Sequence, residues 1–396
     1  MRIPKQFALL TAGFACAAVT PTPAMHLNPT ALAIRTAVRL NPTALAIRTV
    51  SHSPCTSSSL KSVAPAATNP AIGSLGAEPS ADYCTGAPSS KSNGRLFVFL
   101  PGTGAVPNEY QDVLVAAENL GYHVIGLSYP NGATAGANLL AEELTLICGD
   151  KSASDLPCWT AVRANRFLGT PEPASTPHDP YEVKGSDDNA IQPRLESLLT
   201  YLGWSQYITA GGLPNYAKIV FGGHSQGGGE AAYIGSRVRT AGVLIFSSPD
   251  DGLMPSGGTA TCQTGPTETT QAASWVNAKP ATALSHFYGL VSCTDPGFTP
   301  VETVWAHLGG KMGLNAYGEP AAVASGRATP TSTHQFWSEF PTPAGSSGVL
   351  WQHDSTVLDS ATPLCSGTST PALLPVWDEM LIGAGGLSGP MQRSIC

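Results

Sequence analysis

The stretch KIVFGGHSQGGGEAAYIGSRV, from Lys218 to Val238, decides the fold of this chain. It opens on an apolar run that ends at Phe221, as a buried β-strand does, and continues into an alanine-containing pattern typical of a helix. Between the two, Gly223, Ser225 and Gly227 form a GxSxG motif. A serine on a sharp turn from strand to helix presents its hydroxyl at the edge of a sheet, where it can act as a nucleophile.

The glycines around Ser225 have a steric reason. A turn that strains the serine backbone leaves no room for Cβ atoms two residues before and two residues after it, which accounts for Gly223 and Gly227. Gly228 and Gly229 extend the run, although each glycine in a helix costs about 1 kcal/mol relative to alanine. Successive glycines at a helix start therefore indicate close packing. The simpler alternative is a glycine-rich turn that carries an ordinary surface serine.

Outward from this motif, short apolar runs alternate with helical patterns, which is typical of βαβ units and a mainly parallel sheet. The expected strands are residues 96–100, 123–127, 218–221, 242–246 and 286–291. Helices are expected at residues 109–120 and 190–202, from the motif to about 240, and at 373–381. The excursion from Gly149 to about Asp187 is too long for an ordinary connection and is a candidate lid. The sequence thus predicts an α/β fold.

The composition excludes several classes of protein. Hydrophobic residues make up 42% of the 396 residues, so the chain is not a disordered one. Charged residues make up only 12%, about half the usual share, and the 42 glycines and 34 prolines indicate many turns. The net charge is −7 and no dense Lys/Arg run occurs, so we expect neither nucleic acid nor an anionic membrane as a partner.

The first 24 residues are expected to be a signal peptide, because Arg2 and Lys5 precede an apolar stretch at residues 7–19 and small residues at 21–24. That stretch is too short to span a bilayer, which needs about 20 residues, so we expect export without stable membrane insertion. Residues 25–85 form an expected low-complexity leader in which LNPTALAIRT occurs at 27–36 and again at 40–49. The catalytic domain is expected to span residues 86–396.

Removal of the signal peptide would also remove Cys16 and leave an even number of cysteines, which in an exported chain suggests disulfides. The eight are Cys55, Cys84, Cys148, Cys158, Cys262, Cys293, Cys365 and Cys396. Pairing of neighbours would join Cys148 to Cys158 and Cys262 to Cys293, each bond contributing about 2 to 4 kcal/mol. No CxxC or paired Cys/His spacing occurs, so we predict no metal site and no cofactor.

A serine hydroxyl needs a base that is itself held by a carboxylate. We favour Asp295 as the carboxylate, because it follows an expected strand in VSCTDPGF and can be fixed in a tight turn beside proline. Asp250 and Asp251, in FSSPDDG one strand earlier, are the alternatives.

We favour His353 as the base, because VLWQHDSTVLD should form the last loop before the final helix. His334, in TSTHQFW, is the rival. His286 and His307 are expected to have ordinary packing or surface roles, and the ring of His224 must point away from the serine and pack behind it.

The oxyanion of an acyl-transfer reaction needs backbone N–H donors just after the nucleophile and on the loop after an early strand. Gln226 follows Ser225, and the strand at 96–100 runs into PGTGAVP, in which Thr103 would present its amide. The alternative for this loop is a plain turn. It is not a phosphate-binding loop, because the GxGxxG spacing is absent and no lysine follows.

Together PGTG, GYHVIGLSYPN and GHSQGG resemble the α/β-hydrolase superfamily, especially its secreted bacterial esterase-like and depolymerase-like members. The resemblance extends from about residue 96 to the C-terminus. It implies an α/β-hydrolase fold, a triad of Ser225, Asp295 and His353, and oxyanion donors at Thr103 and Gln226. Pro-Gly stands where the family has His-Gly, which leaves the choice between Thr103 and Gly104 open.

These observations predict a secreted serine hydrolase that cleaves small-molecule or polymeric carboxylic esters through an acyl-serine intermediate. A polyester depolymerase, a lipase or an acyltransferase is an alternative on the same scaffold, because a fold and a triad do not fix the substrate. An alternative of another class is a non-catalytic binding protein that kept the scaffold. A Ser225 hydroxyl out of reach of any histidine would favour that alternative.

Overall fold

The computed structural model describes residues 54–72, 80–89, 91–132, 147–148, 156–173, 182–183, 187–252, 271–310, 313–318, 320–323, 333–341, 349–388 and 396. The expected signal peptide and the repeat lie outside these residues, as do residues 149–155, 174–181 and 184–186 of the candidate lid. So does Cys262, and with it the expected pairing of Cys262 with Cys293.

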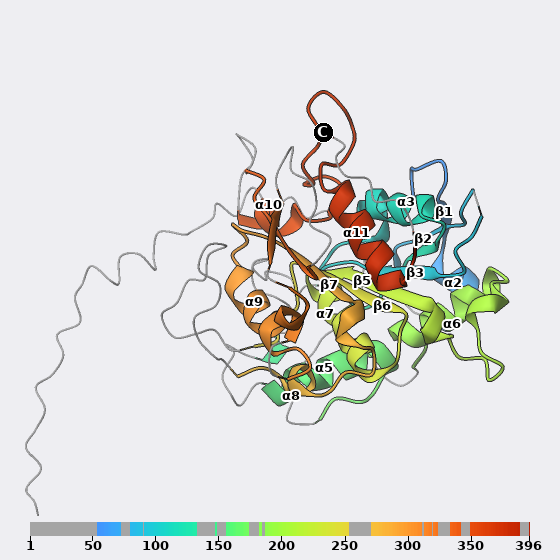
Figure 1. Cartoon of the computed structure of the whole chain (residues 1–396). Coiled ribbons are helices and arrows are strands. Elements are labelled where there is room, and N and C mark those ends of the chain that lie inside the picture. The colour runs from blue at the N-terminus through green and yellow to red at the C-terminus, as the bar shows by residue number, and fades with distance from the viewer. Residues whose placement is uncertain are drawn as a thin grey trace, which may run out of the picture. The chain divides into compact units, whose positions relative to one another are not determined.

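The described chain is built on one nine-stranded sheet (Figure 1) with the order β1-β2-β4-β3-β5-β6-β7-β9-β8. The strands are β1 (Lys61–Val63), β2 (Tyr83–Gly86), β3 (Leu96–Leu100), β4 (His123–Gly126), β5 (Ile219–His224), β6 (Gly242–Phe246), β7 (Phe287–Ser292), β8 (Ala321–Val323) and β9 (Gln335–Ser338). All neighbours from β4 to β8 pair in parallel, whereas β1 with β2 and β2 with β4 are antiparallel. The fold is therefore of the α/β class.

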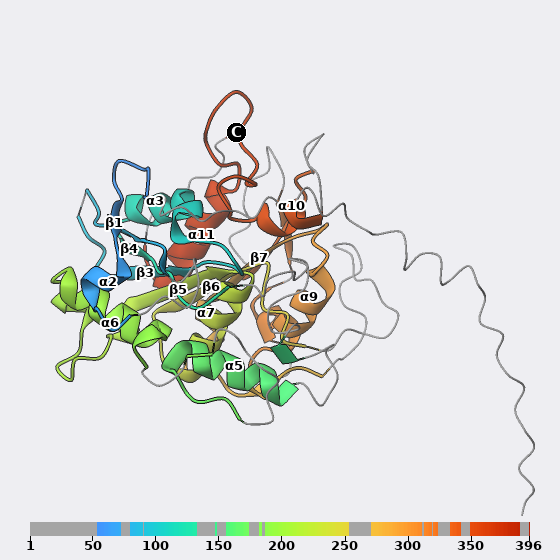
Figure 2. The ribbon, with the colours of Figure 1, turned by 180° about the vertical axis from the view of Figure 1, so that it is seen from behind.

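Helices cover both faces of the sheet, as the two opposite views show (Figures 1 and 2). They are α2 (Pro65–Thr68), α3 (Gln111–Asn119), α5 (Leu156–Leu168), α6 (Ile191–Tyr201), α7 (Gln226–Arg237), α8 (Ser274–Asn277), α9 (Phe298–His307), α10 (Val349–Asp354) and α11 (Leu374–Gly385). One core cluster joins the sheet to α3 and α11, and the other joins it to α5 through α9. Parallel strands buried on both faces read as continuous apolar runs, which is why LFVFL forms β3.

Strands β3 and β6 have the bounds that the sequence predicts, and β4 and β7 differ from them by one residue. Strand β5 is longer than predicted, because Gly222, Gly223 and His224 continue the ladder up to Ser225. Gly222 has no side chain, and this lets β5 pack closely against β3, since a Cβ on Gly222 would overlap the ring of Phe97.

The sheet also includes residues that precede residue 86, the expected start of the catalytic domain. β1 and β2 add two antiparallel strands to the edge at β4, and the disulfide Cys55–Cys84 holds this segment. Part of the expected leader is therefore folded onto the sheet. These strands are three and four residues long, too short for a periodic pattern to reveal them.

Three disulfides occur among the described residues: Cys55–Cys84, Cys148–Cys158 and Cys365–Cys396. The expected Cys148–Cys158 bond is thus present, and a chain with several disulfides fits an oxidising compartment. Within the described residues, no helix has the length and apolar character needed to cross a membrane.

Candidate active site

Ser225 lies on the turn between β5 and α7, at the carboxyl edge of the parallel sheet. Its φ of 53° and ψ of −122° are uncommon for a residue with a side chain. Its N–H donates to the carbonyl oxygen of Phe246 at 2.9 Å, and its carbonyl oxygen accepts the N–H of Gly229 at 3.0 Å. These bonds hold the strained backbone in place and leave the side chain half-buried at the end of the strand.

The glycines of the motif are required by close backbone contacts. A Cβ on Gly223 would overlap the carbonyl of Gly227, and a Cβ on Gly227 would overlap the carbonyl of Leu100 at the end of β3. A Cβ on Gly229 would overlap the guanidinium of Arg163 from α5. Helix α5, which lies in the middle of the candidate lid segment, is thus packed directly behind the turn.

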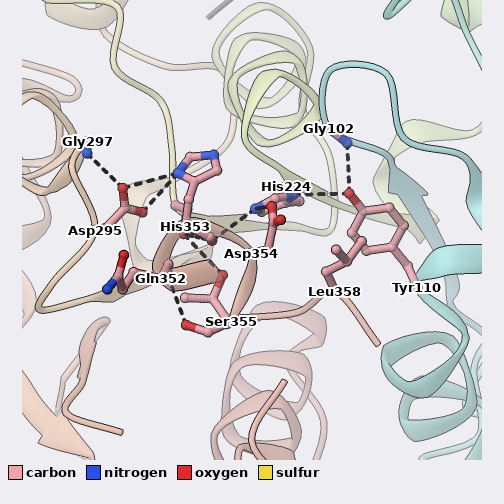
Figure 3. A network of polar contacts seen from close by, with 12 residues as sticks. Gly102, Tyr110, His224, Asp295, Gly297, Gln352, His353, Asp354, Ser355 and Leu358 are labelled. Atoms are coloured by element: carbon pink, nitrogen blue, oxygen red, sulfur yellow. Dashed lines mark hydrogen bonds and ion pairs between the residues drawn. The ribbon is translucent and has the colours of Figure 1, made fainter. Parts of the chain in front are cut away.

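Asp295, which is buried, and His353, which is half-buried, form a carboxylate–imidazole pair (Figure 3). The Nδ1 of His353 lies 3.0 Å from Oδ2 and 3.1 Å from Oδ1 of Asp295, and the N–H of Gly297 donates to Oδ1 at 2.7 Å. Burial alone would raise the pKa of Asp295, but the charge of His353, its hydrogen bond and the N–H of Gly297 outweigh burial and lower that pKa. The carboxylate is therefore ionised and orients the ring, with the second nitrogen facing away from Asp295.

The backbone of His353 is anchored at the carboxyl edge of β5 and β6. Its carbonyl oxygen accepts the hydroxyl of Ser247, which follows β6, at 2.8 Å. The same oxygen lies 3.1 Å from Nε2 of His224, the residue before Ser225. The prediction that His353 lies on a loop was wrong, because residues 349–354 form helix α10. A helix turn fixes the ring position more firmly than a loop.

Asp251, one of the alternative acids, is engaged elsewhere. Its carboxylate accepts Nη2 of Arg163 at 2.6 Å, Nε of Arg163 at 3.2 Å and Nε1 of Trp275 at 2.8 Å, and all of its side chain is buried. Asp250 precedes it on the same loop. Asp251 is therefore paired with an arginine behind α7. The carboxylate that lies beside His353 is that of Asp295.

His334, the alternative base, lies at the opposite edge of the sheet. It precedes the first residue of β9, and its ring stacks between Tyr288 at 4.1 Å and Tyr317 at 4.7 Å between centroids. His286 likewise precedes β7, and His307 ends α9. Because the strands are parallel, a residue at their amino ends is a full strand length away from Ser225.

The loop after β3 is held by Asn131, a buried residue. Its side-chain Nδ2 donates to the carbonyl oxygen of Gly102 at 2.6 Å and to that of Ala105 at 2.9 Å. The backbone carbonyl oxygen of Asn131 accepts the N–H of Gly104 at 2.8 Å. In a planar trans peptide the C=O and N–H point in opposite directions, so the N–H of Thr103 points away from Asn131. This geometry favours Thr103 over Gly104 as a donor.

The two candidate oxyanion residues touch each other. The hydroxyl of Thr103 donates to Oε1 of Gln226 at 3.1 Å, and the side chain of Gln226 is buried. Within the described part of the chain, the backbone N–H groups of Thr103 and Gln226 have no acceptor. Two unsatisfied N–H groups beside a nucleophile are what an oxyanion site requires.

The hydroxyl of Ser225 makes no hydrogen bond within the described residues. The structure therefore shows a histidine–carboxylate pair whose imidazole ring lies 4.9 Å from that of His224, the residue before the strained serine, not a closed line of three hydrogen bonds. Catalytic hydrogen bonds are often long in the absence of substrate and tighten when it binds. Among the described residues, no group of three or more His, Cys, Asp or Glu side chains could hold a metal ion.

Sequence reasoning missed Tyr110 and Asn131, and it assigned His224 to packing alone. The structure joins Tyr110 to His224 by a buried hydrogen bond of 3.0 Å and packs the two rings 5.8 Å apart. The only signal in the sequence was that Asn131 ends the tract GYHVIGLSYPN, which contains an expected strand at residues 123–127.

No protein-family model and no curated protein matches the chain. Among solved structures, it is similar to carboxyl esterase 2 from the mycorrhizal fungus Tuber melanosporum. The two chains are 12% identical, the match covers 91% of this chain and 100% of the esterase, and the TM-score is 0.39. A likeness at this level carries no argument about activity, which depends on the site itself.

Proposed function

We propose that this chain is a serine hydrolase with an α/β-hydrolase fold that cleaves carboxylic esters through an acyl-serine intermediate. The observation that carries the proposal is the strained turn at Ser225 next to the Asp295–His353 pair, at one edge of the sheet. Strain at a single side-chain-bearing residue persists only where surrounding structure imposes it, and it concentrates at functional sites.

In the proposed reaction, Nε2 of His353 removes the proton of the Ser225 hydroxyl as Oγ attacks the ester carbonyl carbon. The N–H groups of Thr103 and Gln226 stabilise the negative oxygen of the tetrahedral intermediate. That intermediate expels the alcohol, which takes the proton from His353. Water then attacks the acyl-serine with His353 as base, which releases the acid and restores the hydroxyl.

The same proposal includes export, because the N-terminal pattern and the disulfides fit a secreted chain. A small or a polymeric ester remains the substrate class, with transfer to an acceptor other than water as the alternative outcome.

Fluorophosphonate labelling tests the proposal. The folded protein should be labelled at Ser225 and should hydrolyse p-nitrophenyl acetate, and Ser225→Ala should abolish both. Ser236→Ala is the matched control, because Ser236 is a buried serine near the other end of α7 that donates to a backbone carbonyl. An unlabelled Ser225 in a folded protein, with turnover equal in Ser225→Ala and the wild type, would refute the acyl-serine route.

A further inference from the structure

A chain of hydrogen bonds through Tyr110 and His224 (Figure 3) has no direct part in the proposed reaction. It begins at the N–H of Gly102, which donates to Oη of Tyr110 at 3.1 Å. From this hydroxyl it continues to Nδ1 of His224 at 3.0 Å, and from Nε2 of His224 to the carbonyl oxygen of His353 at 3.1 Å. The chain thus connects the residue before one proposed oxyanion donor to the proposed base.

Only one arrangement of protons satisfies every atom in this chain. The carbonyl oxygen of His353 can only accept, so Nε2 of His224 carries the proton and donates. In a neutral imidazole Nδ1 is then an acceptor, and the hydroxyl of Tyr110 donates to it. The same hydroxyl oxygen accepts the N–H of Gly102. The direction of the chain is therefore fixed from Tyr110 to His353.

His224 is held in this neutral form. Burial lowers its pKa to about 3, and the nearby charge of His353 lowers it as well. The carboxylate of Asp354, 3.8 Å from Nε2, and that of Asp295 are the acidic groups near the ring. Burial also raises the pKa of Tyr110 well above its usual value, so its hydroxyl keeps the proton it donates.

The chain is also rigid, because its members are packed against the nucleophile. The ring of Tyr110 lies 4.8 Å from that of Phe99 in β3, and both Tyr110 and His224 are buried. A Cβ on Gly102 would lie 2.9 Å from Nδ1 of His224 and 3.2 Å from the Cβ of Ser225. A shift of Tyr110 or His224 would therefore move the loop of Gly102 relative to Ser225.

We propose that Tyr110 and His224 are positioning residues that hold the oxyanion loop and the backbone of His353 in one fixed arrangement around Ser225. This inference rests on the proposed function. It assigns no contact with substrate to either residue, because both act through the groups that they hold.

Tyr110→Phe tests the inference, because it removes one oxygen and keeps the packing of the ring. We expect kcat to fall about 10- to 100-fold with little change in KM, as for a small misplacement of catalytic groups. The inhibition constant of phenylboronic acid, which mimics the tetrahedral intermediate, should rise by a similar factor as kcat/KM falls. Tyr122→Phe is the matched control, since it removes a buried hydroxyl that donates to the carbonyl of Leu381 at 2.6 Å, away from the site.

Two substitutions of His224 separate the ends of the chain. His224→Asn can place an oxygen near the position of Nδ1 and accept from Tyr110, whereas His224→Gln can place an N–H near the position of Nε2 and donate to His353. Each should lose less kcat than His224→Ala. All rates are divided by the fraction of sites that fluorophosphonate labels, so that loss of folded protein does not count as loss of catalysis.

A Tyr110→Phe or His224→Ala variant with wild-type kcat per labelled site would overturn the inference. So would a fall in kcat equal to that of Tyr122→Phe, because the effect would then be one of stability. Neither result would touch the proposed function, which fails separately if the wild-type protein is neither labelled nor active.

Discussion

Asp295→Asn is the substitution that tests the proposed roles of Asp295 and His353 most directly. The N–H of Gly297 donates to Oδ1 at 2.7 Å, so the oxygen of the new amide should stay at that position. Its NH₂ group then takes the place of Oδ2, 3.0 Å from Nδ1 of His353. The amide oxygen at the Oδ1 position also lies 3.1 Å from Nδ1, but it accepts from Gly297, and the NH₂ group at 3.0 Å repels a proton on Nδ1. We therefore expect Nδ1 to become the acceptor and the ring proton to move to Nε2.

With a proton already on Nε2, His353 cannot accept the proton of Ser225. In triads of this kind the wrong tautomer lowers kcat about 10⁴-fold. We therefore expect a fall of about 10³- to 10⁴-fold, or about 4 to 5 kcal/mol of transition-state stabilisation. The assay is kcat for p-nitrophenyl acetate, with the thermal midpoint of each variant measured alongside.

Residues that act as a unit give non-additive losses, so Ser225→Ala combined with Asp295→Asn should be no slower than Ser225→Ala alone. Asp188→Asn is the control, because this carboxylate accepts from Asn69, at the end of α2, at 3.3 Å. If Asp295→Asn keeps more than about a tenth of kcat while folded, the tautomer argument is refuted.

Three further predictions concern stability. Arg163→Met should lower the free energy of unfolding by about 3 to 5 kcal/mol in urea titrations, because it leaves Asp251 buried and unpaired. Burial and nearby carboxylates raise the pKa of Asp359 from 3.8 to about 7. The folded state therefore binds the proton that the unfolded chain releases, and the free energy of unfolding should fall as pH rises from about 4 to about 7. Asp359→Asn should flatten this dependence, measured by urea midpoints across the range. Replacing Cys55 and Cys84 by serine should cost about 3 to 4 kcal/mol by calorimetry, given the separation of 29 residues.

The parts of the fold that the sequence predicts are those set by local pattern. Strands β3 and β6 are apolar runs buried on both faces, so their bounds could be read directly. The elbow could be found for the same reason, since the strand, the GxSxG motif and the helix are contiguous. The short outer strands β1, β2, β8 and β9 could not, because three or four residues form a strand there only through pairing with a neighbour.

The candidate site divides in the same way. Asp295 could be proposed from its place after a strand, because strand ends carry the site in a parallel sheet. The link from Tyr110 to His224 could not, since it joins side chains 114 residues apart whose approach depends on how β3 and β5 pair. Asp251, the alternative acid, also follows a strand, and its ion pair with Arg163, which joins residues 88 apart in sequence, could not be read from the pattern.

The arrangement of β5, β6 and β7 explains why the proposed base comes from a distant part of the chain. Ser225 follows β5 and Asp295 follows β7, so the two are separated by one strand and, at about 4.8 Å per strand, by about 10 Å. An acid and a nucleophile at that distance cannot touch, and a ring between them has to be held above the end of β6. Ser247, at the end of β6 with a φ of 50°, supplies the hydroxyl that holds the carbonyl of His353 there. Ser247 and Ser225 thus share a positive φ at the end of neighbouring strands. The turn at Ser247 brings its hydroxyl to the carbonyl oxygen of His353, and the turn at Ser225 would bring the proposed nucleophile to the same end of the sheet.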